Sequence, residues 1–249
     1  MSEALRALVA EAARVVPGLE GHVATSDAAA PWHAGTGLSA VQHFWASRYP
    51  EAGPHYAALR GWGLLVWQPI YVAVIAAHLG DAQPDLDCLS LVVDEGEVSG
   101  YRFGTHEPLR SDEAGRMRFG AMQIAAGIER LLPAWQAHAP LHAKAARRTC
   151  ADCALAALLA VRRQRQWSSA YTRELGAQWL AALGLSGESG FLAYRAASGT
   201  EAMALEHKVC CLHFRRRDAE RCNTCPKRPL AERIERLKDA AMDEVKSES

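Results

Sequence analysis

The stretch CCLHFRRRDAERCNTCP, which runs from Cys210 to Pro226, contains four of the seven cysteines of this 249-residue chain. Two of the four are adjacent, ten residues follow, and the last two form a C-x-x-C turn that ends in proline. Such a turn can bring both of its sulfurs onto one metal, because the intervening backbone amides point back at the thiolates. Adjacent cysteines are unusual in zinc ribbons and fingers, whose halves are built from more widely spaced ligands.

The spacing alone leaves three interpretations open. Four clustered cysteines in an intracellular protein are most often a structural zinc site. Adjacent cysteines also suit a ligand set that is shared over a larger body than one ion, such as a two-iron cluster held by four thiolates. Free thiols or disulfides are the third interpretation.

The pattern C-C-x10-C-x2-C followed by proline resembles the C-terminal motif of the ferric-siderophore reductase (FhuF-like) family. Members of that family are cytoplasmic [2Fe–2S] proteins that reduce imported ferric siderophores. The resemblance implies that the cluster ligands are Cys210, Cys211, Cys222 and Cys225.

Looser family landmarks lie upstream of the cysteines. They are Trp62-Gly63 followed by Pro69, the helix around 167–179, and the Gly-Leu run before Phe191. One departure is that many relatives have an arginine just before the cysteine pair, where this chain has His207-Lys208-Val209. The departure leaves the ligands unchanged and leaves any role of that arginine around the cluster without a counterpart in the motif.

The composition is that of an ordinary soluble protein. Apolar residues make up 49% and charged residues 22% of the chain, and the formal net charge is zero, so no global field favours nucleic acid or an anionic membrane. The first residues alternate acids and bases at helical spacing, which does not fit a signal peptide. Seven cysteines without an export signal indicate a reducing compartment. We therefore expect a cytoplasmic protein, or one at the inner face of the membrane.

One apolar stretch, from Trp62 to Ala77, is long enough to raise the question of a membrane span. Gln68 and Pro69 interrupt it, and the unbroken part from Ile70 to Ala77 is much shorter than the roughly 20 residues that a bilayer requires. Proline fits the first position of a helix, where its missing N–H costs nothing. The sequence thus predicts a buried core helix over 69–79 and no transmembrane segment.

Hydrophobic periodicity predicts an α+β fold, mainly helical with a small antiparallel hairpin, in which the iron–sulfur motif precedes a C-terminal amphipathic helix. Strand signals lie at 191–195 and in a hairpin over 89–103 that turns at Asp94-Glu95-Gly96. Trp32 and His33 lie in a loop over 18–37 and are expected to anchor it on the core. We expect an N-terminal subdomain over 1–143 and a helical subdomain over 144–249 that carries the motif, or one compact domain. The expected helices lie at 1–16, 39–48, 54–66, 69–79, 119–132, most of 144–183 up to a cap at Gly184, and from Pro229 onward.

The remaining candidate residues point to packing more than to chemistry. Cys150 and Cys153 form a second C-x-x-C inside a helical stretch, where their spacing favours two structural thiols, and Cys88 is expected in the core. His213 is at most a hydrogen-bond partner of a cluster sulfur, because four cysteines complete the ligand set. Five aromatic residues are candidates for a substrate surface, although a core role suits most of them: Trp62, Trp67, Tyr71, Trp167 and Trp179.

Charge around the cysteines suggests how electrons arrive. Between His207 and Lys238 there are ten Lys/Arg against four Asp/Glu. Such a basic segment favours a reduced cluster and offers a docking surface to an acidic donor such as a ferredoxin or another reductase. No glycine-rich phosphate loop for a nicotinamide or flavin is present, so a partner must supply the electrons.

Two functions remain open at this point. One is an oxidoreductase that reduces the Fe³⁺ of a ferric siderophore through a [2Fe–2S] cluster. The other is a non-catalytic module, zinc-stapled or iron–sulfur sensing, that binds a partner through its basic C-terminal region. No recognition-helix motif for nucleic acid accompanies the basic residues.

Overall fold

The computed structural model describes residues 3–24, 30–196 and 199–247. The described chain is mainly helical with sheets of two or three strands, which confirms the predicted α+β class. The helices and strands are α1 (Glu3–Val15), β1 (Gly21–Val23), α2 (Leu38–Arg48), η1 (Pro50–Ala52), α3 (Pro54–Leu79), β2 (Ala82–Gln83), η2 (Leu86–Cys88), β3 (Leu89–Asp94), β4 (Glu97–Phe103), β5 (Leu109–Arg110), α4 (Glu113–Gln136), α5 (Ala143–Arg165), α6 (Ser169–Ala182), β6 (Phe191–Arg195), β7 (Glu201–Leu205), η3 (His213–Arg215) and α7 (Leu230–Ser247).

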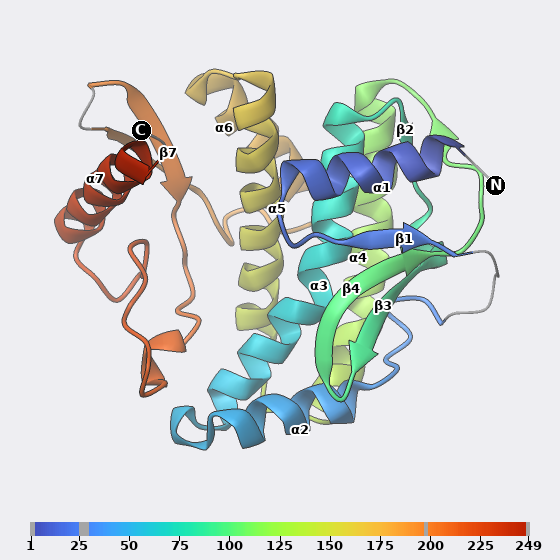
Figure 1. Ribbon diagram of the computed structural model, residues 1–249, viewed down its shortest axis with the longest axis horizontal. Helices are drawn as coiled ribbons and strands as arrows, with labels where there is room; N and C mark the ends of the chain where they lie inside the picture. Colours follow the sequence, from blue (N-terminus) through green and yellow to red (C-terminus); the bar gives the residue numbers. More distant parts are fainter. Residues whose placement is uncertain (1–2, 25–29, 197–198, 248–249) are drawn as a thin grey trace.

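Figure 1 shows a helical body with α1 and the β3–β4 hairpin on one side. The β6–β7 hairpin, the cysteine segment and α7 lie on the opposite side of the body. Helix α3 runs through the body and packs against α4 and α5. This arrangement places the cysteine segment beside helices that are distant from it in the sequence.

The prediction of two helices separated at Pro69 is wrong, because α3 runs through this position. The helix is continuous over 26 residues and contains Pro69 in its interior. Proline lacks the N–H that would bond to the carbonyl of Leu65, a loss that usually costs a helix about 3 kcal/mol or more. Pro69 and its neighbour Ile70 are buried, so packing on both sides holds the helix together across this position.

Two buried tryptophans join the helices of the core. The indole N–H of Trp62 donates to the carbonyl of Ala146 at 3.1 Å, and that of Trp135 donates to the carbonyl of Ala58 at 3.1 Å. Each bond satisfies a polar group that would otherwise be costly to bury, and each links helices that are far apart in the sequence. Trp62 and Trp179 are fully buried, so neither is available to a substrate.

The predicted hairpin is confirmed, and it belongs to a larger sheet. Strands β3 and β4 pair antiparallel, and β1 adds to β4 in parallel, in the order β1–β4–β3. Glu95 and Gly96 both have positive φ, as the tightest hairpin turns require. A Cβ on Gly96 would lie 2.4 Å from the carbonyl oxygen of Ala40, so only glycine fits there. The short strand β1 falls inside the loop expected at 18–37, where three residues are too few to show a period.

Trp32 and His33, which were expected to anchor the loop on the core, lie near this sheet. Trp32 is only 4% exposed, and its backbone N–H donates to the carbonyl of Leu89 at 2.7 Å. The ring of His33 hydrogen-bonds to Asp87. Both residues therefore anchor the loop on the core.

The long helical region predicted at 144–183 is two helices. Gln166 adopts the left-handed conformation and ends α5, and Ser168 caps the start of α6 by accepting from the N–H of Tyr171. Gly184, at φ 65°, follows α6 as predicted. The expected subdomain boundary falls between α4 and α5, and one hydrophobic cluster includes buried residues from both sides of it. Separate folding of 1–143 and 144–249 stays a prediction.

Among the described residues, α3 is the helix whose length and apolar composition would suffice to cross a membrane. Of its most apolar 18-residue stretch, 72% is buried inside the protein. Burial by other helices is typical of the central helix of a soluble core. This agrees with the prediction that the stretch is a core helix.

Candidate metal centre

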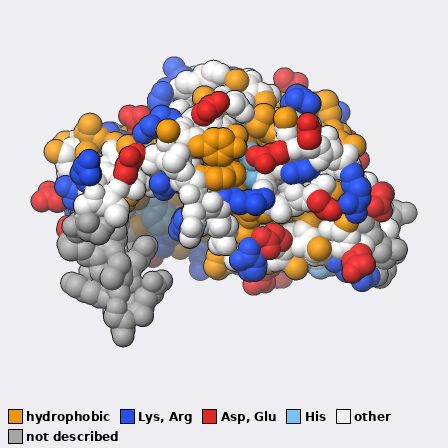
Figure 2. Space-filling view, turned by 90° about the horizontal axis from the view of Figure 1, so that it is seen from above, with side chains coloured by type: hydrophobic (Ala, Val, Ile, Leu, Met, Phe, Trp, Pro, Cys, Tyr) orange, Lys and Arg blue, Asp and Glu red, His pale blue; other side chains and the backbone are white. Residues whose placement is uncertain are grey.

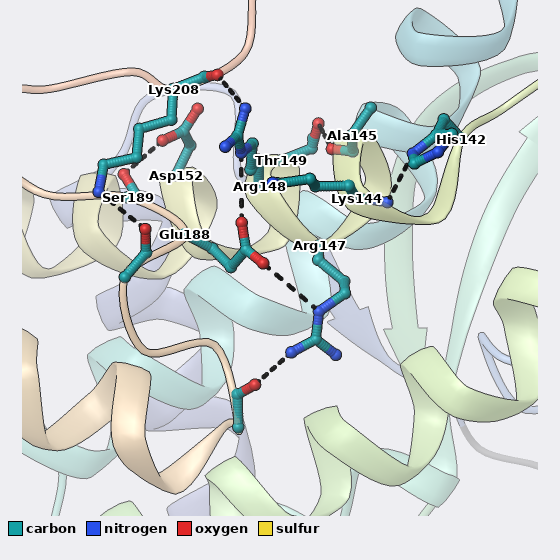
Figure 3. A network of polar contacts seen from close by, with 12 residues as sticks. His142, Lys144, Ala145, Arg147, Arg148, Thr149, Asp152, Glu188, Ser189 and Lys208 are labelled. Carbon is teal, nitrogen blue, oxygen red and sulfur yellow. Dashed lines mark hydrogen bonds and ion pairs between the residues drawn. The ribbon is translucent and has the colours of Figure 1, made fainter.

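The cysteine segment leaves strand β7 and is fixed first to helix α5 (Figure 3). The ring of His207 hydrogen-bonds to Asp152 at 2.7 Å, and the hydroxyl of Ser189 donates to the other oxygen of the same carboxylate. The guanidinium of Arg148 donates to the carbonyl of Lys208 at 2.6 Å. Burial lowers the pKa of His207, but the bond to Asp152 outweighs it and the net shift is upward. The hydrogen-bonded pair of His207 and Asp152 therefore holds the chain three residues before Cys210.

A second anchor holds the segment after the cysteine pair. The ring of His213 lies 3.4 Å from the hydroxyl of Tyr56 on α3. The guanidinium of Arg216 stacks 4.0 Å above the ring of Tyr49, and that of Arg217 lies 3.5 Å from Glu51. The cysteine pair thus lies between two anchored stretches, one bonded to α5 and the other in contact with α3 and the segment around Tyr49.

The sulfur contacts join the two halves of the motif. The Sγ atoms of Cys210 and Cys225 lie 3.7 Å apart. The thiol of Cys222 hydrogen-bonds to Cys211. Two thiolates on one tetrahedral metal, each about 2.3 Å from it, are separated by about 3.8 Å. The spacing of the Cys210–Cys225 pair therefore suits two ligands of one metal.

The protonation of the four sulfurs follows from these contacts. The hydrogen bond from Cys222 lowers the pKa of Cys211 to about 5, against the effect of burial, and the backbone N–H of His213 adds to the lowering. The same bond raises the pKa of Cys222, while burial raises the pKa of Cys210 to about 11. Cys211 is thus the sulfur that the chain itself prepares as a thiolate, the form that binds metals.

The arrangement fits a two-metal centre. Among the described residues, no three His, Cys, Asp or Glu side chains converge as one ion would require. Two separate pairs are instead what a [2Fe–2S] cluster needs, because each iron takes two thiolates. A single zinc ion would require all four sulfurs around one point. The sulfur contacts therefore favour the cluster over zinc.

A pocket of about 320 Å³ opens beside this centre, between α3, α5 and the cysteine segment, and we call it the α3–α5 pocket. Cys211 and Cys222 line it, whereas Cys210 and Cys225 do not. Its far wall includes Tyr71 of α3 and Ala156 of α5. One pair of sulfurs therefore faces a small open space, and the other pair is turned away from it.

The other cysteines lie in the helical body or at the start of the hairpin. Cys150 is fully buried, and burial raises the pKa of its thiol to about 12. Burial also raises the pKa of Cys153, which lines the α3–α5 pocket. Cys88 is half-buried in η2. High thiol pKa values make the 150/153 pair unreactive, in agreement with the structural role predicted for it.

The basic residues after the cysteines are partly committed to the protein itself. Arg216 pairs with Asp218 and stacks on Tyr49, and Arg217 pairs with Glu51. Arg215 is exposed, and no hydrogen bond or ion pair joins its side chain to the residues that the structure describes. Figure 2 shows acidic and basic side chains interspersed over the face that it presents. The predicted docking patch is therefore narrower than the sequence suggests.

These features define an iron–sulfur protein whose centre lies in a C-terminal segment. Residues 208–227 match the family model described as the FhuF 2Fe-2S C-terminal domain. The predicted resemblance is thus confirmed over the segment that contains all four cysteines, and its cofactor is a [2Fe–2S] cluster. No solved structure matches the chain at a significant level.

Sequence reasoning found the cysteines and missed the residues that position them. Asp152 lies between Cys150 and Cys153, and its partner His207 is 55 residues away, so no local pattern marks it. Tyr49, Tyr56 and Glu51 lie more than 150 residues before the cysteines, and no local pattern connects them. The signal available was the aromatic run before α3, which a soluble surface rarely exposes.

Proposed function

We propose that the protein reduces siderophore-bound Fe³⁺ to Fe²⁺ by transfer of a single electron, with Cys210, Cys211, Cys222 and Cys225 as cluster ligands. The observation that carries the proposal is the α3–α5 pocket, which opens directly onto Cys211 and Cys222. An acceptor in this pocket would lie against the sulfurs of the centre. The family match over 208–227 supports an iron–sulfur protein of this type.

One-electron reduction of the iron requires no acid or base catalyst from the chain. A [2Fe–2S] cluster supplies one electron at a time. One electron converts one Fe³⁺ to Fe²⁺, and no bond in the chelator has to be hydrolysed. Hard oxygen donors hold Fe³⁺ much more tightly than Fe²⁺, so the reduced ion is released. The protein's part is to bind the chelate close to the sulfurs, to hold those sulfurs in place and to receive electrons from a donor.

We further propose a ferredoxin or another reductase as that donor, and the cytoplasm or the inner face of the membrane as the location. Arg215, four residues after Cys211, is an exposed cation that an acidic donor can contact. The cations of this segment also offset the negative charge of a four-thiolate cluster and so favour its reduced form.

The test is an anaerobic single-turnover experiment. Dithionite-reduced protein, freed of excess reductant, is mixed with a ferric hydroxamate and a ferrous-specific chelator that draws the reaction forward. We expect the cluster absorption to return to its oxidised form as ferrous complex appears, with close to one iron released for each cluster oxidised. If the cluster stays reduced with every ferric chelate offered and yet reoxidises in air, the sensing module becomes the better interpretation.

A further inference from the structure

We propose that the α3–α5 pocket binds one oxygen-donor arm of the ferric chelate, with hydrogen bonds from Tyr71 and Arg60. This inference rests on the proposed function and adds to it the part of the substrate that is recognised. Two features of the pocket support this. Two unpartnered donors in its wall favour a ligand with oxygen acceptors, and its volume suits a part of a chelate.

The first donor is the hydroxyl of Tyr71. Its ring packs edge-on against Trp67, with 5.5 Å between the ring centroids, so the side chain is held in position. Among the described residues its hydroxyl has no hydrogen-bond partner, although the side chain lines the pocket. Burial strongly raises the pKa of Tyr71, which keeps its hydroxyl protonated and able to donate. A half-buried donor without a partner gains most from a ligand oxygen.

The second donor is the guanidinium of Arg60, one α3 side chain that reaches the same pocket. It stacks 4.8 Å from the ring of Trp45, and no acidic group pairs with it in the described part of the chain. The carboxylate in the pocket wall, Asp152, is already engaged by His207 and Ser189. Hydroxamate, catecholate and carboxylate oxygens are all acceptors that a free guanidinium binds well.

The size of the pocket limits what enters it. Sites that enclose a whole drug-sized ligand span about 300–1,000 Å³, and 320 Å³ is at the lower end of that range. A ferric complex with three bidentate arms is larger than this pocket can enclose. One arm fits between Tyr71 and the cysteines, and the rest of the chelate stays in solvent. We therefore expect the protein to tolerate different chelator backbones while it recognises a single arm.

The side of the centre that faces the pocket is consistent with this placement. Cys211 and Cys222 form one of the two sulfur pairs, and both are exposed. The other pair includes Cys225, which is only 1% exposed. An arm seated in the pocket therefore meets the accessible pair.

Binding is measured with a chelate that cannot be reduced. The probe is the gallium(III) complex of desferrioxamine B, a linear trihydroxamate, titrated calorimetrically into the oxidised, cluster-loaded protein. We expect Tyr71→Phe to weaken binding by about threefold to tenfold, the net worth of one hydrogen bond. Arg60→Gln should weaken it by a similar factor. Ala156→Leu, which fills the pocket, should weaken it at least tenfold.

Matched controls separate this effect from a general loss of stability. Tyr171→Phe makes the same chemical change on α6, where the ring also packs edge-on against a tryptophan, Trp167. Ala181→Leu adds the same bulk at an exposed position of that helix. Both controls should bind the gallium complex like the unmodified protein. The cluster content and midpoint potential of Tyr71→Phe should also be unchanged.

Several outcomes would overturn the inference. They are failure of the unmodified protein to bind the gallium complex, equal binding by the pocket variants, and loss of the cluster in Ala156→Leu, which would show that the pocket is the cluster's own volume. The proposed function fails independently of this. If the gallium complex binds as predicted but no ferric chelate is reduced, the pocket assignment stands and the reductase assignment falls. If the protein reduces ferric chelates and the pocket variants also bind and reduce them normally, the reductase assignment stands and the pocket assignment falls.

Discussion

At the scale of single residues, the cysteine spacing identified the candidate ligands but not how they pair. A C-x-x-C turn suggests that Cys222 and Cys225 share a metal, whereas the sulfur contacts join Cys210 to Cys225 and Cys211 to Cys222. The two sulfurs of the vicinal pair therefore take different partners. This pairing depends on anchors such as Asp152 and Tyr49, and no local spacing could reveal them.

Replacing any ligand should remove or destabilise the cluster. We expect protein purified anaerobically to contain about two irons and two sulfides per chain. Serine at Cys210, Cys211, Cys222 or Cys225 should abolish or weaken the visible absorption of the cluster and lower the iron content. The measurement is metal and acid-labile sulfide analysis together with the visible spectrum.

The matched control is the pair of cysteines on α5. Cys150→Ala with Cys153→Ala should keep the full iron content, because neither sulfur belongs to the two sulfur pairs of the motif. Alanine is preferred to serine there, since a hydroxyl at the buried Cys150 would lack a partner. One zinc and no iron in the unmodified protein would contradict the cluster assignment altogether.

At the scale of the elements, propensity and periodicity found most helices, and tertiary packing decided how they join. The sequence divided α3 at Pro69, where local rules favour a new start. The buried surroundings of that residue override the rule. The short strand β1 pairs with β4 through contacts about eighty residues apart, and this is why the pattern of its three residues carried no signal.

The end of α3 should make stability depend on pH. His78 is 1% exposed, and its Nε2 accepts a hydrogen bond from the indole N–H of Trp179 at 2.8 Å. Its Nδ1 therefore carries the proton and donates to Glu113 at 2.8 Å. Burial lowers the pKa of His78, and the effect of Glu113 only partly opposes this. A proton on Nε2 would break the bond to Trp179.

The sign follows from the lowered pKa. Above the unfolded pKa of about 6.5 the ring is neutral in both states, so the stability is fully present. As the pH falls below that value, the unfolded chain binds the proton first and the free energy of unfolding drops. We expect the melting temperature, followed by far-UV circular dichroism, to fall between pH 7 and pH 5 with a shallower slope in His78→Gln. Equal slopes in both proteins would contradict this assignment.

At the scale of the whole molecule, the basic segment has two different roles. Arg216 holds the cysteine segment against α2 and η1, whereas Arg215 is free to meet a partner. We expect Arg215→Ala to slow reduction by an acidic ferredoxin and to reduce its sensitivity to salt, because exposed charges are screened within about 10 Å at 0.1 M. Reduction by dithionite should stay normal. Stopped-flow rates at several salt concentrations give the measurement.

Arg216→Ala provides the contrast. Loss of the contact with Tyr49 should loosen the cysteine segment, so we expect faster cluster loss on exposure to air even when no donor is present. If both variants slow the ferredoxin reaction alike and neither affects cluster lifetime, the division of roles is wrong. Salt-independent transfer would mean that no charged donor docks at this segment.

The helical body should fold without the cluster. Its core is formed by α1, α3, α4, α5 and α6, and the cysteine segment is tied to that core by contacts that do not involve the four sulfurs. We expect the apoprotein to keep nearly all of its helical circular dichroism and to melt cooperatively, with the loss confined to the C-terminal segment. A molten or unfolded apoprotein would show that the metal organises the fold, as it does in zinc fingers.

The two sulfur contacts, Cys210 with Cys225 and Cys211 with Cys222, make the segment a pair of nested loops. The outer contact encloses the inner one, as the outermost rungs of a hairpin enclose those nearer its turn. The ten residues between Cys211 and Cys222 form the tip, and its first part is held against the helical body through His213, Arg216 and Arg217. Because the entropy of closing a loop grows only with the logarithm of its length, residues added after these anchors cost little. A change of electron donor in evolution, or an engineered docking loop, therefore requires no change in the metal site itself.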